Sequence, residues 1–156
     1  MEREDDYTHW NIEDCRTNAQ IYERYHEMTL NFMRFLHERK PMDWMAAEFY
    51  RSMAYQYLVY VIPEGKRPKE TFIFTKNKIE ETTARRYRTF FSFEAAKTLG
   101  TLRALYLFAE YLEATESLTR GRKESIQQWC TELFNQAYPS LVTKKFSARA
   151  FERFPA

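Results

Sequence analysis

Glycine is nearly absent from this chain of 156 residues, which contains only Gly65, Gly100 and Gly121. Since glycine supplies most of the left-handed conformations that tight turns require, sharp turns must be few. The chain also has only two cysteines, Cys15 and Cys130. Two thiols in a chain of this length do not make a disulfide framework and are typical of small buried apolar residues. Long helices joined by a few loops fit both scarcities.

Long apolar runs are missing as well. The most apolar stretch, residues 57–62, is far shorter than the 18 or so residues of a membrane span. The first six residues are mostly charged, which is unlike a secretory signal. Without either signal, we expect a chain that works in the cytoplasm of a cell or of an infected host.

Aromatic residues, in contrast, make up 17% of the chain, with 13 Phe, 11 Tyr and 3 Trp. The hydrophobic share of 44% and the charged share of 29% are typical of a globular protein, and the length fits one domain. Residues 1–14 carry six acidic side chains and one basic one, so the net charge of +2 arises in the rest of the chain. We therefore expect an acidic leader over residues 1–10 and a single helical domain over residues 11–156.

Apolar residues recur at helical spacing in four segments, which predicts helices at 12–39, 42–61, 93–117 and 123–137. Asn11 is the expected N-cap of the first helix. Pro139 is expected to end the fourth helix. A glycine inside the third helix, Gly100, predicts close packing against another helix. The apolar stripe of the first helix is expected to contain Cys15, Ala19, Tyr22, His26, Thr29, Met33 and Leu36, widened by Tyr25, Phe32 and Phe35.

Residues 69–91 leave two interpretations open. A helix over 77–87 is favoured, but 71–75 is aromatic and β-branched and could pair with 86–91 as a hairpin. The predicted fold class is therefore all-α, a bundle of four to five helices, with a small β-hairpin within 69–91 as the alternative.

No motif in the chain specifies a chemistry. Glu23-x-x-His26 has the spacing of a di-iron ligand pair, but the second pair that such a site needs does not exist. His26 and His37 share a helix face at about 16 Å along the axis, too far apart for one metal, so we expect hydrogen-bonded, partly buried histidines. No Gly-x-Ser-x-Gly elbow or phosphate-binding glycine loop occurs. We predict no metal, cofactor or catalytic residue, and an enzyme whose site forms only in three dimensions is the third alternative.

Three basic clusters support a second hypothesis, an accessory protein that binds nucleic acid. Lysine and arginine can neutralise phosphates, and neighbouring aromatic rings can stack on bases. Each cluster alone is more simply explained as solvated surface charge, so this hypothesis requires all three to converge on one face. The candidate residues are Arg85, Arg86, Arg88, Arg120, Arg122, Lys123, Lys144, Lys145 and Arg149.

Four tyrosines on the second predicted helix support the leading hypothesis. Tyr50, Tyr55, Tyr57 and Tyr60 point in different directions from one helix, so one core face cannot bury all of them. Tyrosine is enriched at protein interfaces because it combines a large ring with a polar tip. The sequence therefore predicts a non-enzymatic helical protein that binds another protein or a second copy of itself, with an exposed apolar and tyrosine patch and no membrane contact.

Overall fold

The structure, a computed structural model, describes residues 10–62, 71–85 and 94–142. Across these residues the regular elements are helices, without a strand, in agreement with the expected all-α class. The elements are α1 (Asn18–Arg39), α2 (Trp44–Tyr60), α3 (Lys76–Glu80), the π-helical turn η2 (Glu81–Arg85), α4 (Glu94–Ala114) and α5 (Arg120–Val142).

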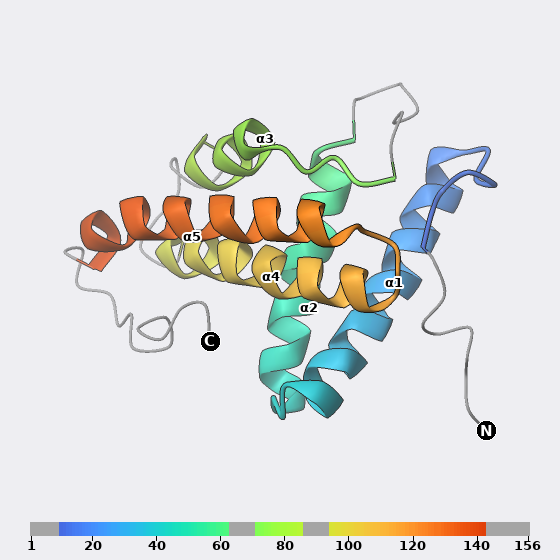
Figure 1. Ribbon diagram of the computed structural model, residues 1–156, viewed down its shortest axis with the longest axis horizontal. Coiled ribbons are helices and arrows are strands. Elements are labelled where there is room, and N and C mark those ends of the chain that lie inside the picture. Colours follow the sequence, from blue (N-terminus) through green and yellow to red (C-terminus); the bar gives the residue numbers. More distant parts are fainter. Residues whose placement is uncertain (1–9, 63–70, 86–93, 143–156) are drawn as a thin grey trace.

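Two helical hairpins form the molecule. α1 and α2 run antiparallel through a short turn, and α4 and α5 do the same (Figure 1). α2 crosses α4 and packs on it, while α3 lies along α5. The predicted helix over 77–87 is thus present as α3 followed by η2. Residues 86–91, which the alternative hairpin needs, lie outside the described residues.

The first helix begins later than the sequence predicts. A capping box starts α1 at Thr17, whose hydroxyl accepts from Gln20 N (3.2 Å) while Gln20 Oε1 accepts from Thr17 N (3.1 Å). Asn11 instead accepts from Glu13 N (3.1 Å) in a local turn, so it caps no helix. A turn precedes the helix instead, closed by Cys15 N donating to Ile12 O (3.0 Å), and it brings Ile12 and Cys15 into the core, where both are buried.

The last helix passes the residue expected to end it. α5 starts at Arg120 rather than 123 and continues through Pro139 to Val142. Proline removes one backbone donor from a helix, but packing of an apolar face supplies most of a helix's stability. Helical spacing predicts Ile126, Trp129, Cys130, Leu133 and Phe134 on that face. All of them except the partly buried Trp129 are buried, and they stabilise the helix up to the proline.

The buried face of α1 is rotated relative to the predicted stripe. Its buried residues are Ile21, Tyr25, Met28, Thr29, Phe32, Phe35 and Leu36. Tyr22 and His26, assigned to the stripe, are exposed, and Met33 is only partly buried. Apolar and aromatic side chains cover so wide an arc of α1 that spacing alone did not show which part faces inward.

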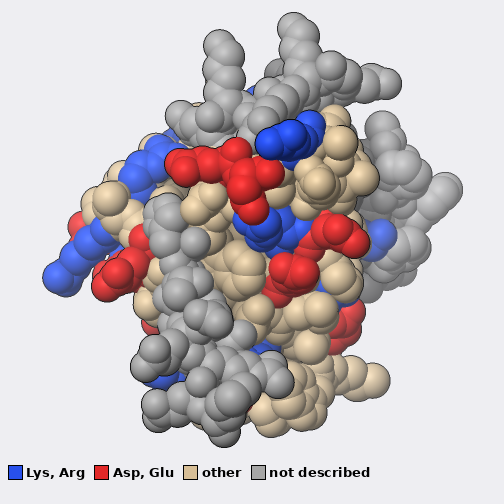
Figure 2. Space-filling model, turned by 90° about the vertical axis from the view of Figure 1, so that its right-hand side faces the viewer, with Lys and Arg blue, Asp and Glu red and all other residues tan. Residues whose placement is uncertain are grey.

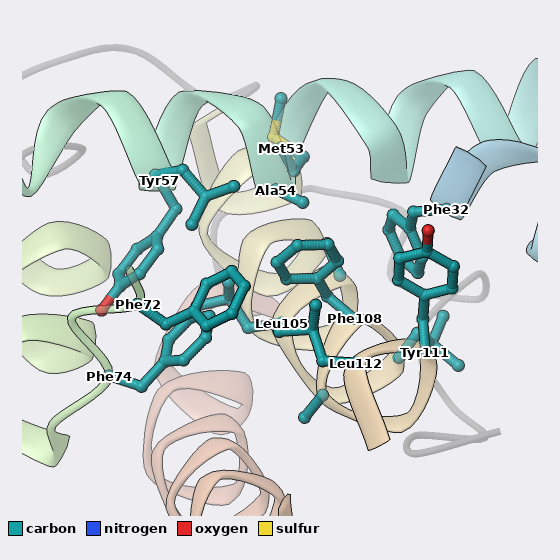
Figure 3. Close-up of a cluster of buried hydrophobic side chains, with 14 of the residues drawn as sticks. Phe32, Met53, Ala54, Tyr57, Phe72, Phe74, Leu105, Phe108, Tyr111 and Leu112 are labelled. Atoms are coloured by element: carbon teal, nitrogen blue, oxygen red, sulfur yellow. The ribbon is translucent and has the colours of Figure 1, made fainter. Parts of the chain in front are cut away.

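An extended segment, residues 71–75, completes the core between the two hairpins. Phe72 and Phe74 enter an aromatic cluster with Tyr57 of α2 and Phe108 of α4 (Figure 3). Side chains rather than a neighbouring strand donate to three of the segment's carbonyls. Tyr25 Oη donates to Thr71 O (2.6 Å), Tyr57 Oη to Ile73 O (2.7 Å) and Arg122 Nη2 to Phe74 O (3.1 Å).

Gly100 is buried on α4 where the ring of Phe49 from α2 crosses it. A Cβ at this position would lie 2.5 Å from Phe49 Cε1, well inside van der Waals contact. The close approach expected from a mid-helix glycine is therefore present. Within the described ranges, no helix combines the length and apolar content that crossing a bilayer requires.

Candidate interaction surface

The large hydrophobic side chains that remain exposed gather on one hairpin. Among the described residues, all of them lie on α1 or α2: Tyr22 (36% exposed), Leu30 (39%), Trp44 (50%), Met45 (85%) and Tyr60 (42%). α4 and α5 have none of this kind in their described parts. Exposed apolar side chains that cluster on one part of a surface are typical of interaction sites.

On α1, four side chains form a row beside the buried face. His26, Leu30, Met33 and His37 are spaced by four, three and four residues, which places them within one arc of the helix. His26 and Leu30 are exposed, and Met33 and His37 are partly buried. Tyr22 extends the row by one turn.

On α2, a matching row repeats the same spacing. Trp44, Glu48, Arg51 and Tyr55 are again separated by four, three and four residues. Trp44 and Glu48 are exposed, whereas Arg51 and Tyr55 are partly buried. We call the eight residues of the two rows the α1–α2 strip.

Two ring contacts join the rows at their ends. His37 stacks on Trp44 with ring centroids 3.8 Å apart, and its Nδ1 lies 2.8 Å from Met42 O, an acceptor that selects the Nδ1–H tautomer. His26 meets Tyr55 edge-on at 5.9 Å. In an antiparallel pair these two contacts fix the register, which puts Leu30 level with Arg51 and Met33 level with Glu48.

The charges inside the strip neutralise each other. Arg51 Nε and Nη2 donate to the two carboxylate oxygens of Glu48 at 2.6 and 2.7 Å, a bidentate pair within one helix. This hydrogen bonding lowers the pKa of Glu48. The strip therefore offers apolar, aromatic and imidazole groups around one compensated ion pair.

The four predicted interface tyrosines separate into two groups. Tyr50 and Tyr57 are buried, and burial raises the pKa of each. Their rings belong to the core, which removes them from the expected interface. Tyr55 lies in the strip. Tyr60 is exposed near the end of α2, on a different side of that helix from Tyr55.

Intramolecular contacts occupy the basic cluster at 120–123. Arg120 pairs with Glu124 (3.3 Å), Arg122 donates to Phe74 O (3.1 Å), and Lys123 pairs with Glu113 (2.7 Å). Arg85 ends η2, and the other candidates, Arg86, Arg88, Lys144, Lys145 and Arg149, lie outside the described residues. Convergence of the three clusters thus stays a prediction.

The surface around α1 carries charges of both signs. On the face turned toward the viewer in Figure 2, positive and negative side chains intermingle, and uncharged residues gather at the lower right, at the height of the α1–α2 turn in Figure 1. Ion pairs such as Arg24–Asp14 (2.9 Å) contribute to this mixture. The described residues of this view form no broad basic area of the kind that a nucleic-acid duplex would favour.

Metal chemistry finds no support in the described part of the chain, where no three His, Cys, Asp or Glu side chains cluster around a common point. Cys15 and Cys130 are both buried, and burial raises the pKa of Cys130. An inert, protonated thiol fits the expected role of a small apolar residue.

No similar protein or structure was found for this chain. Family models, curated proteins and solved structures were all compared with the chain, and none matches. Sequence reasoning missed Leu30 and Trp44 as surface residues, and it placed Met33 in the core stripe. A signal that could have found them is a row of residues at helical spacing separate from the core stripe. Such a row, spaced by four, three and four residues, occurs on both helices.

Proposed function

We propose that this chain acts by binding protein through the α1–α2 strip and that binding, rather than a reaction, is its biochemical activity. The observation that carries the proposal is the location of the exposed hydrophobic side chains, which among the described residues all lie on α1 or α2. Two of the five, Leu30 and Trp44, belong to the strip, and Tyr22 lies one turn beyond it. Trp44, half exposed and stacked on His37, has the character of an interface anchor, since tryptophan leads the residues that dominate binding energy.

The strip also avoids the usual cost of burying charge. Its two charged residues already pair with each other, so a partner that covers them leaves neither carboxylate nor guanidinium alone. A surface of this composition fits the apolar face of a protein better than a phosphate backbone, which needs uncompensated lysine and arginine.

Site-specific photocrosslinking tests this function. A photoreactive phenylalanine analogue replaces Leu30 in cells that normally make the protein, and the same analogue replaces Asn135, an exposed residue of α5, as the matched control. We expect a discrete adduct from position 30 and none from position 135.

A second variant ties the adduct to the strip. Adding Trp44→Ala should reduce the adduct at position 30 by roughly tenfold or more, which corresponds to the loss of one anchor of about 1.4 kcal/mol or above. Equal labelling from positions 30 and 135, or no adduct at all, would contradict the proposal. The mass of the adduct identifies the partner.

A further inference from the structure

The α1–α2 strip has an approximate internal two-fold symmetry, and this symmetry is relevant to the partner that would bind it. Along α1 the order is His26, Leu30, Met33, His37, which reads histidine, apolar, apolar, histidine. Along α2 the order is aromatic, acid, base, aromatic, from Trp44 through Glu48 and Arg51 to Tyr55. Both rows use the spacing 4-3-4, so each half of the strip resembles the other half reversed.

The two ends of the strip match in structure as well as in sequence. One end is a histidine on an aromatic ring, His37 on Trp44, and the other end is also a histidine on an aromatic ring, His26 on Tyr55. Between them lie two apolar side chains and one ion pair. Two-fold dimers require a patch of this kind, in which residue i meets residue j and j meets i.

We propose that the occupant of the strip is a second copy of this chain, docked face to face and antiparallel about a two-fold axis at the middle of the strip. This inference rests on the proposed function. In this arrangement α1 faces α1 of the other copy and α2 faces α2. Leu30 then meets Met33 of the other copy, and Trp44 meets Tyr55.

Charge complementarity favours this orientation over the parallel one. The antiparallel axis places Glu48 of each copy opposite Arg51 of the other, so the two ion pairs become one four-membered network at the centre. A parallel dimer would place α1 against α2, with Arg51 opposite Leu30 and Glu48 opposite Met33. In that orientation neither charge gains a partner from the other copy, so the ion pair of each chain stays isolated.

The available area sets the strength of the dimer. The 12 residues from Trp44 to Tyr55 make a face about 18 Å long, and two adjacent helices are about 20 Å wide. Each copy would bury roughly 350 Å², or about 700 Å² for the pair, which is the size of a weak, transient contact. We therefore expect a dimer that dissociates on dilution, with a dissociation constant on the order of 100 micromolar or weaker.

Disulfide trapping on the purified full chain tests the arrangement. The two native thiols are buried at 2% and 0% exposure, so an introduced surface cysteine is the reactive one. Leu30→Cys mixed with Met33→Cys should form a mixed disulfide at least tenfold faster than Leu30→Cys mixed with Asn135→Cys. Sedimentation of the unmodified chain should show a concentration-dependent dimer, which Leu30→Glu weakens at least tenfold.

The outcomes separate this inference from the function beneath it. Preferential coupling of Leu30→Cys to Arg51→Cys would overturn the antiparallel orientation. A monomer at all concentrations, together with a photoadduct from position 30 to a different protein, would overturn the second copy and keep the binding function. A monomer without any photoadduct would overturn both.

Discussion

Gly100 contacts the ring of Phe49 so closely that the two positions must be considered together. Alanine is a better helix former than glycine by about 1 kcal/mol, so replacement would ordinarily stabilise α4. Here the added Cβ would lie 2.5 Å from the ring, which also makes an edge contact with Tyr50 at 5.4 Å. The ring is partly buried, so to make room for the added Cβ it must shift and change its contact with Tyr50.

We predict that the effect of Gly100→Ala on the free energy of unfolding changes sign with the residue at position 49. In the native background it should lower the free energy of unfolding by about 1 kcal/mol, because overpacking costs more than the helix propensity that alanine adds. In a Phe49→Ala background it should raise that free energy by up to about 1 kcal/mol. Urea unfolding of the four proteins measures the coupling, and additive effects would show that the ring moves away at no cost.

Residue identity also explains what the sequence could and could not predict about the binding surface. The 11-residue interval placed His26 and His37 on one helix face, and the structure agrees. Whether that face points inward depends on partners far along the chain, such as Phe108, against which Phe32 packs at 5.0 Å. Spacing within α1 contains no information about those partners, so Leu30 and Trp44 were not recognised as surface residues.

Among the elements, the extended segment 71–75 depends most on the rest of the fold. It has no strand neighbour among the described residues, and side chains of α1, α2 and α5 donate to three of its carbonyls. The aromatic and β-branched composition suggested a strand in the alternative interpretation, but the structure shows an extended segment and no strand here. The donors that hold it lie as many as 48 residues away in sequence, which no local pattern could reveal.

Removing one of these donors tests the importance of the segment. Tyr57→Phe keeps the ring but leaves the Ile73 carbonyl without its 2.7 Å donor. We predict a loss of about 1–2 kcal/mol in the free energy of unfolding, the typical cost of an unsatisfied buried acceptor. Tyr22→Phe, which alters an exposed ring, should change stability by less than about 0.5 kcal/mol. Similar values for the two variants would contradict the role given to the Tyr57 hydroxyl.

All four long helices were predicted, but the predicted ends of the helices were less accurate than their existence. The capping box Thr17-x-x-Gln20 was readable in the sequence, but Asn11 with Asp14 offered a competing start. Burial of Ile12 and Cys15 decides between the two, and burial is a property of the assembled molecule.

At the scale of the whole molecule, the buried tyrosine hydroxyls and the Cys130 thiol make the stability of the fold depend on pH. Burial raises the pKa of Tyr25, Tyr50, Tyr57 and Cys130. In the unfolded chain these groups ionise near their usual values, about 8.5 for cysteine and 10 for tyrosine. The folded state therefore holds their protons more tightly, so their contribution to stability is complete below about pH 8.5 and is lost as the pH rises above it.

We predict that the free energy of unfolding falls from about pH 8.5 and falls more steeply above about pH 10, by up to 1.4 kcal/mol per pH unit for each buried group. Urea titrations across this range measure the slope. Cys130→Ala should remove the decline between about pH 8.5 and 10 while keeping the steeper one. A constant free energy up to about pH 11 would show that these groups ionise freely in the folded chain.

The hydrogen bonds to the 71–75 segment have a consequence for solubility. Thr71-Phe-Ile-Phe-Thr75 is uncharged, aromatic and β-branched, the composition that favours cross-β stacking between chains. In the folded state, Tyr25, Tyr57 and Arg122 occupy the carbonyls that an added strand would use. The side chains that bind the segment to the core thus also block edge-to-edge aggregation, and a chain that loses them exposes a segment of amyloid-prone composition.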